Sequence, residues 1–280
     1  MSLSFSVEST LPYGVDAKRT GARAPALPSG GMRVFWSVAV VVGMPVCCQV
    51  GYWLGRHARR RPDGDAMSHT MNWQAAVLAL GALLIGFTFS MATQRFEYRK
   101  KILLNEANAI GTAYLRTRVV DDPAGEDIRA LMRQYIDRRI ALYDVSDAAS
   151  VAAVERASAV LQQQIWSQVM TAARGYQRPV MTGLLVTAVN EMIDVADERR
   201  AVRENPVPYT AFVVLVLVTG VAMVSIGYTC GVTGKKLLFG MLVMPLLTAA
   251  VVVLVYDLAD VSSGLARPNN LALEHLKQDL

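Results

Sequence analysis

Residues 73–118 read WQAAVLALGALLIGFTFSMATQRFEYRKKILLNEANAIGTAYLRTR, and this stretch decides the fold. Its first part, 73–92, is apolar and long enough to cross about 30 Å of hydrocarbon at 1.5 Å per residue. Its second part keeps a helical spacing of apolar residues and contains no proline, but it is strongly charged. We therefore expect one unbroken helix that joins a membrane anchor to a helical body in water.

The composition of the whole chain agrees with a membrane protein. Of its 280 residues, 53% are hydrophobic, and the formal net charge is +5. This apolar share exceeds that of ordinary soluble domains and is concentrated in four runs. Because the basic residues flank these runs, we expect them to set topology or contact lipid head groups, and we expect no nucleic-acid partner.

The four runs predict an all-α integral membrane protein with four transmembrane helices and a large cytosolic helical bundle between the second and third. We expect residues 1–31 to be a disordered leader, which could be an artefact of the assigned start. The predicted division is 34–92 for the first two spans, 93–206 for the bundle, 207–256 for a transmembrane hairpin and 257–280 for a short tail. The individual spans are expected at 34–54, 73–92, 209–228 and 237–256.

Turn signals divide the bundle into helices with short connections. Asp121-Asp122-Pro123 ends the extended second helix, Gly175 ends a later one, and Pro179 opens the last. The expected helices are 93–120, 123–144, 147–174 and 179–204. Lys and Arg are more numerous on the flanks shared with both termini and the bundle, which favours a cytoplasmic location for all three. The arginines at 56 and 59–61 argue for the opposite orientation.

One face of the second span carries side chains that grade from apolar to polar. They lie within about 80° of one another at 100° per residue, and they are Ala79, Leu83, Phe87, Ser90 and Gln94. The simpler interpretation is a helix packed against its neighbours. The functional interpretation is a pore lining, in which an apolar constriction opens into a polar vestibule.

Polar residues set among apolar ones indicate a buried network in the bundle. The candidates are Glu106, Asn108, Thr112 and Arg116 on the second helix and Asn190, Glu191 and Asp194 on the last. We expect Glu106 or Asn108 to meet Asn190 or Glu191 and to fix the helix register, although a ligand or ion site would use the same residue types.

The sequence shows no enzymatic or metal-binding motif. None of its three histidines or three cysteines has a partner at ligand spacing, and no nucleophile with a base is recognisable. Asp257 and Asp260 form an acidic pair that we interpret as capping or ion pairing. We therefore predict no catalysis, no cofactor and no metal.

Three segments resemble the bacterial bestrophin-like family. They are FTFSMATQRFEYRKKILLNEANAIGTAYLR at 87–116, AVNEMID at 188–194 and YDLADVSSGL at 256–265. The turn after the last span departs from the family pattern at Ala259-Asp260-Val261. Bestrophins are pentameric ion channels of four membrane helices with both termini cytosolic, and no residues here match the calcium clasp that some members carry.

The resemblance implies a homo-oligomeric ion channel, possibly pentameric, in the bacterial inner membrane. Its partners would be membrane lipid, further copies of itself and inorganic ions. Alignment on Gly86 would place the neck of the pore at Ala79, Leu83 and Phe87, which belong to the face identified above. The alternative is a non-conducting, membrane-anchored helical protein that binds or senses a partner.

Overall fold

The computed structural model describes residues 30–58, 64–145, 147–175, 179–204, 209–234, 239–259 and 270–280, and within these ranges no residue forms a strand. The helices are α1 (Gly30–Ala58), α2 (Gly64–Arg116), α3 (Ala124–Asp144), α4 (Ala148–Gly175), α5 (Pro179–Glu204), α6 (Tyr209–Thr233), α7 (Met244–Ala259) and α8 (Leu271–Asp279). A short 3-10 turn, Thr117–Val119, follows α2, and a π-helical turn, Phe239–Val243, precedes α7. The predicted leader lies almost wholly outside the described residues.

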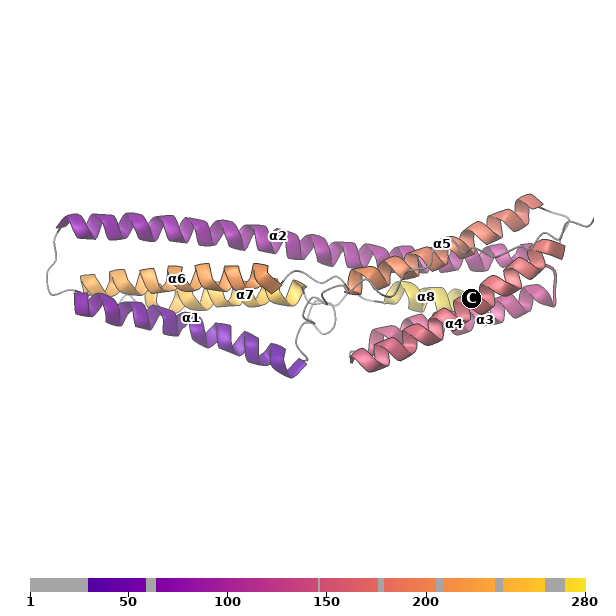
Figure 1. The fold of residues 1–280 in the computed structure, drawn as a ribbon, viewed down its shortest axis with the longest axis horizontal. Coiled ribbons are helices and arrows are strands. Elements are labelled where there is room, and N and C mark those ends of the chain that lie inside the picture. Colours follow the sequence, from indigo (N-terminus) through magenta and orange to yellow (C-terminus); the bar gives the residue numbers. More distant parts are fainter. Residues whose placement is uncertain are drawn as a thin grey trace, which may run out of the picture.

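The longest helix, α2, runs along the whole molecule (Figure 1). Its 53 residues make it about 80 Å long at 1.5 Å per residue. Its first half lies beside α6 and α7, with α1 on their other side, and its second half lies within a bundle with α3, α4, α5 and α8 (Figure 1). One helix therefore joins the two parts of the protein, as the sequence predicts.

Among the residues that the structure describes, four stretches are long and apolar enough to cross a membrane: Val34–Ala58, Met71–Val119, Val180–Thr233 and Gly240–Ala259. The first three contain the spans expected at 34–54, 73–92 and 209–228, and the fourth overlaps the span expected at 237–256 from residue 240 onward. The start of α1, the start of α6 and the end of α7 all lie at the end that adjoins the bundle, while α1 joins α2 at the opposite end (Figure 1). The bundle and the beginning of the first span thus share one side of the membrane.

The last span begins with a change of helix type. Phe239–Val243 forms a π-helical turn, and Pro245 follows as the second residue of α7. A proline has no N–H to donate to the preceding turn and its ring crowds that turn, so a wider turn before it relieves the conflict.

The bundle has one continuous apolar core, to which the C-terminal helix contributes. Ile110, Met132, Ile165 and Met192 bring fully or almost fully buried side chains from four different helices. The tail was expected to be mixed and short, but its residues 271–279 form α8, whose Leu273 is fully buried in this core. The helical spacing of Leu273, Leu276 and Leu280, which all pack on the core, could have predicted this helix.

Helices α1 and α6 run parallel and approach closely through two pairs of glycines. Gly51 and Gly55 lie on α1, and Gly227 and Gly231 lie on α6. A Cβ atom on Gly227 would stand 1.9 Å from the carbonyl oxygen of Cys48, and one on Gly51 would stand 2.0 Å from that of Val224. Small residues four apart allow membrane helices to pack backbone against backbone.

Replacing Gly227 with valine should separate α1 from α6. The new Cβ cannot fit beside a main-chain oxygen, so the helices must move apart, at a cost of about 1–3 kcal/mol or more. We expect Gly227→Val to lower the thermal unfolding temperature of the detergent-purified protein. Gly220→Val on the same helix is the control, because its nearest neighbour, the sulfur of Cys47, is 3.9 Å away. Equal losses in both variants would contradict close glycine packing.

Candidate functional site

The candidate pore face of α2 is unpartnered in the protomer. Ala79, Leu83, Phe87, Ser90 and Gln94 are all exposed, with Leu83 at 54% and Phe87 at 64%. The opposite face of the helix carries the residues that pack against the rest of the protomer, including Val77, Thr88 and Ala92. The two faces lie roughly 140° apart at 100° per residue. The structure brings the five predicted residues onto one accessible surface, which is compatible with a pore and equally with a lipid or subunit contact.

The polar end of this face has a local hydrogen bond. The Gln94 Nε2 donates to the Ser90 Oγ over 3.1 Å, one helical turn away. Further along α2, Glu97, Lys101, Asn108 and Thr112 are exposed at nearly the same helical phase. A single face of α2 therefore continues from the apolar span into the bundle, and its side chains change from apolar to polar and charged.

Glu106 is the centre of the ionic network in the bundle. Its carboxylate is completely buried and accepts hydrogen bonds from Arg139 on α3 and Arg199 on α5, the latter at 2.5 Å. Glu106 therefore belongs to a buried charged network in this structure. Its predicted partners were wrong, because the sequence pattern did not indicate Arg139, which lies within the charged segment DRR of α3.

A second carboxylate extends this network along α4. Glu155 pairs with Arg203 at 3.2 Å and with the more exposed Arg200 at 3.5 Å. Beside Arg139, the hydroxyl of Tyr135 accepts a hydrogen bond from Gln162 Nε2 at 3.0 Å. The network thus connects α2, α3, α4 and α5, the four long helices of the bundle.

Burial and charge shift the ionisation of these groups in different directions. Burial raises the pKa of Tyr135 to about 12. Burial, followed by the nearby Arg199 charge, lowers the pKa of Arg203 to about 10. Burial alone would lower the pKa of Arg139, but the Glu106 carboxylate outweighs it and the pKa rises. At neutral pH the tyrosine is therefore neutral and both arginines are charged.

The other predicted network residues do not join this cluster. Asn108, Thr112, Asn190, Glu191 and Asp194 are exposed. Asn190 Nδ2 donates to Asp194 at 2.9 Å within α5. Arg116 binds elsewhere on α5, donating to the Leu184 carbonyl at 2.8 Å. Their positions between apolar neighbours in the sequence suggested burial, but the helix phase turns them outward.

Arg99 of α2 lies against the C-terminal end of α7. Its guanidinium donates to the carbonyls of Leu258 at 2.6 Å and Ala259 at 3.3 Å, where the helix dipole favours a cation. Asp257 lies in the same last turn, and Asp260 falls outside the described residues. Among the residues that the structure describes, no group of three or more His, Cys, Asp or Glu could hold a metal ion.

Comparison with known proteins places this fold in a family. Residues 32–264 match the profile of the Bestrophin-like domain, so the chain belongs to the bestrophin-like family. No functionally curated protein matches it in sequence.

Solved structures of a bacterial bestrophin homologue from Klebsiella pneumoniae, each carrying a mutation, share the fold. One is 13% identical with a TM-score of 0.63, covering 89% of this chain and 97% of that chain. Another has the same identity and TM-score and covers 88% and 97%. A third is 14% identical with a TM-score of 0.57 and covers 90% and 96%. At these identities the likeness concerns the fold alone.

Removing the charge of Glu106 should destabilise the bundle. Glu106→Gln leaves Arg139 and Arg199 buried against a neutral amide, and breaking a buried ion pair costs about 3–5 kcal/mol. We expect a large loss of thermal or denaturant stability. Glu126→Gln is the control, because Glu126 pairs with Arg129 and Arg133 at the surface, where such pairs contribute roughly 0–1 kcal/mol. Equal stability of the two variants would contradict a central role for Glu106.

Proposed function

We propose that this protein is a bestrophin-like oligomeric ion channel of the bacterial inner membrane, with its pore lined by α2. Several copies, five by analogy with the family, would surround an axis and present the same face of α2 to it. Inorganic ions would pass between the copies, and membrane lipid would surround them. The proposal is one of transport, without catalysis and without a cofactor.

The observation that carries the proposal is the continuous unpartnered face of α2. Leu83 and Phe87 are exposed one helical turn apart, and Gln94, Glu97 and Lys101 follow on the same face. If several copies of α2 surround an axis, rings of Leu83 and Phe87 form an apolar neck, and the later side chains line a wider polar vestibule. Apolar constrictions of this kind gate ion flow by excluding water.

The vestibule side of this face carries charges of both signs. Glu97 and Lys101 contribute one carboxylate and one ammonium from each copy, four residues apart. The residues just inside the neck therefore add no net charge to the path. This balance favours neither cations nor anions on this part of the path.

Truncating Phe87 should increase ion flux. Phe87→Ala removes a large ring from every copy at once, so the neck becomes wider and wets more easily. Flux should rise about tenfold for each 1.4 kcal/mol by which the barrier falls. The measurement is ion flux into liposomes that contain the reconstituted protein, with the copy number of each assembly determined by native mass spectrometry.

Phe89→Ala is the matched control for this experiment. Phe89 is also exposed, at 40%, but it lies roughly 160° around α2 from Phe87. It should leave the flux unchanged. If Phe87 instead packs at a subunit interface, its truncation leaves a cavity that costs about 3–5 kcal/mol, and the assembly weakens. Intact assemblies of wild type and variant that both fail to conduct would favour the alternative, a non-conducting membrane protein that binds or senses a partner.

The bundle and both termini are proposed to be cytoplasmic. The flanking Lys and Arg residues support this orientation, and the bundle lies on the side from which α1 starts (Figure 1). Two exposed positions allow a test: Arg174 near the end of α4 and Thr233 at the end of α6, on the other side of the spans.

In spheroplasts, an impermeant thiol reagent should label Thr233→Cys and should label Arg174→Cys only after lysis. Wild type gives the background from its own cysteines, of which Cys47 and Cys48 lie in the first span and Cys230 lies near the end of α6. The reverse pattern, with Arg174→Cys labelled in intact spheroplasts, would place the bundle outside.

A further inference from the structure

A pocket opens where α1 and α6 diverge from their close glycine contact. The two helices touch backbone to backbone at Gly51 and Gly227, near the side away from the bundle. Toward the bundle they separate, and α7 closes the back of the space between them. The resulting pocket has a volume of about 240 Å³.

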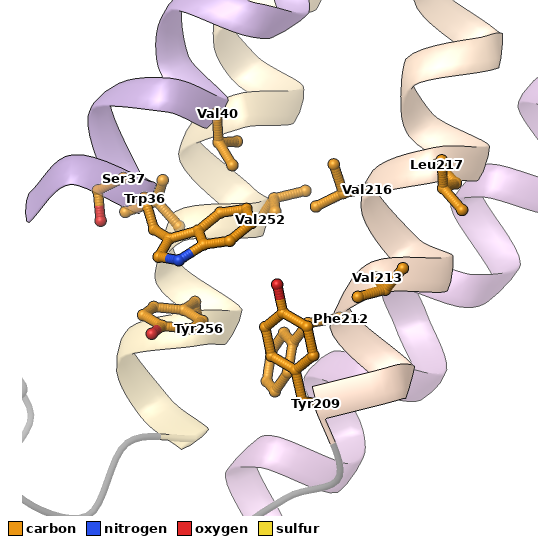
Figure 2. A pocket seen from close by; sticks show the side chains of 11 residues that line it. Trp36, Ser37, Val40, Tyr209, Phe212, Val213, Val216, Leu217, Val252 and Tyr256 are labelled. Carbon is orange, nitrogen blue, oxygen red and sulfur yellow. The ribbon is translucent and has the colours of Figure 1, made fainter. Parts of the chain in front are cut away.

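The pocket is lined almost entirely by apolar and aromatic side chains (Figure 2). Trp36 and Val40 come from α1, Val252 and Tyr256 from α7, and Phe212 from α6, with further residues of α6 completing the wall. Trp36 stands edge-on to Tyr209 at 6.1 Å between ring centroids, and Phe212 stands edge-on to Tyr256 at 5.5 Å. These contacts fix the rings at the end of the pocket nearest the bundle.

The lining and its position together restrict the occupant. A polar or charged ligand would lose its hydration without gaining partners, because nearly every wall atom is carbon. The walls belong to three membrane-spanning helices, so the opening past Leu217, which is 62% exposed, meets the interior of the bilayer. The material available there is the acyl chain of a lipid.

The aromatic end suggests how such a chain would enter. Tryptophan and tyrosine rings favour the boundary between hydrocarbon and head groups. Trp36, Tyr209 and Tyr256 lie at the bundle end of their helices, where that boundary falls. Arg99 donates to the carbonyls of Leu258 and Ala259, just beyond Tyr256, so a guanidinium and the Asp257 carboxylate both lie at this end of α7. We propose that this pocket binds one acyl chain of a bilayer phospholipid, with the head group beside the aromatic end.

A second copy of the chain is a poorer candidate for the occupant. In the fold, α1 and α2 lie on opposite sides of α6 and α7 (Figure 1). The pocket is built by α1, α6 and α7 and has no lining residue from α2. An assembly around the exposed face of α2 therefore leaves this side of the protomer toward the lipid. The pocket itself does not depend on whether the assembly conducts ions.

Photo-crosslinking in vesicles tests this site. The probe is phosphatidylglycerol with a diazirine in one acyl chain, and mass spectrometry locates the labelled peptides. We expect labelling concentrated at 36–40, 209–217 and 252–256, above that of Val46 and Val50, which are exposed on α1 outside the pocket. Uniform labelling of the apolar surface would mean ordinary surrounding lipid, and unlabelled pocket residues would mean that protein covers them. Either result overturns the proposal.

Filling the pocket supplies the specific control. Val213 lines it, whereas the neighbouring Val214 is exposed and does not. Val213→Trp should reduce pocket labelling about tenfold, which corresponds to an acyl chain that buries roughly two fewer methylene groups. Val214→Trp should leave the labelling unchanged. Ser37→Trp fills the same space from α1, so that failure of one variant to fold does not decide the result. Undiminished labelling in both filled variants overturns the proposal.

Competition identifies the source of the chain. Unlabelled phosphatidylglycerol and phosphatidylethanolamine should both reduce pocket labelling, because the chain contributes most of the buried contact. A stronger effect of phosphatidylglycerol would indicate that the Arg99 charge contributes. Competition by a free fatty acid alone, without either phospholipid, would overturn the phospholipid assignment.

Discussion

A single uninterrupted helix, α2, must be stable both in the hydrocarbon of the bilayer and in water. The rest of the structure depends on this constraint. In its first half, α2 is surrounded by hydrocarbon and by α6 and α7. In its second half it packs against α3, α5 and α8 in a bundle in water. A helix satisfies its own backbone hydrogen bonds in either medium, so α2 can cross the boundary without a break. What changes along it is the chemistry of the side chains on each face.

In the bundle, the constraint produces a buried carboxylate with two arginines. Glu106 faces inward from α2 where an apolar residue would otherwise pack, and Arg139 and Arg199 reach it from α3 and α5. Burying these charges costs free energy unless all of them are paired. The arrangement therefore adds little net stability, but a shift of one helix along another would leave a buried charge unpaired and is disfavoured. It also holds α5 in register with α2.

In the membrane, the close contact of α1 with α6 and the pocket beside it have the same cause, which is the angle at which the two helices diverge. Helices that pack backbone to backbone at glycines diverge where larger side chains intervene. Gly51 and Gly227 bring α1 and α6 together at one end, while Trp36 and Tyr209 hold them apart at the other. The space between the separated ends is the apolar pocket. On the other side of α6 and α7, the exposed face of α2 is left for contacts with further copies or for a pore.

The sequence alone was sufficient to predict the helical class, four membrane spans and, within about two residues, the limits of α3, α4 and α5, although it did not indicate α8. These depend on local signals: apolar run length, Pro and Gly at helix ends, and a continuous helical period from 73 to 118. It also identified one face of α2, because side-chain direction along a helix follows from spacing. The family resemblance carried by segments of the chain was confirmed by the match of residues 32–264 to the Bestrophin-like domain.

Partners across helices were decided by tertiary structure alone. The pattern around Glu106 indicated burial. Its two arginine partners, however, lie 33 and 93 residues away along the chain, and local residue spacing does not predict contacts over such sequence separations. Asn190 and Asp194 looked equally buried in the sequence and are exposed, because a small rotation of α5 decides which residues face the core. The glycine contact of α1 with α6 and the pocket each require two or three separate helices to be placed together. Local sequence determines the elements and their faces, whereas the pairing of those faces depends on packing over the whole chain.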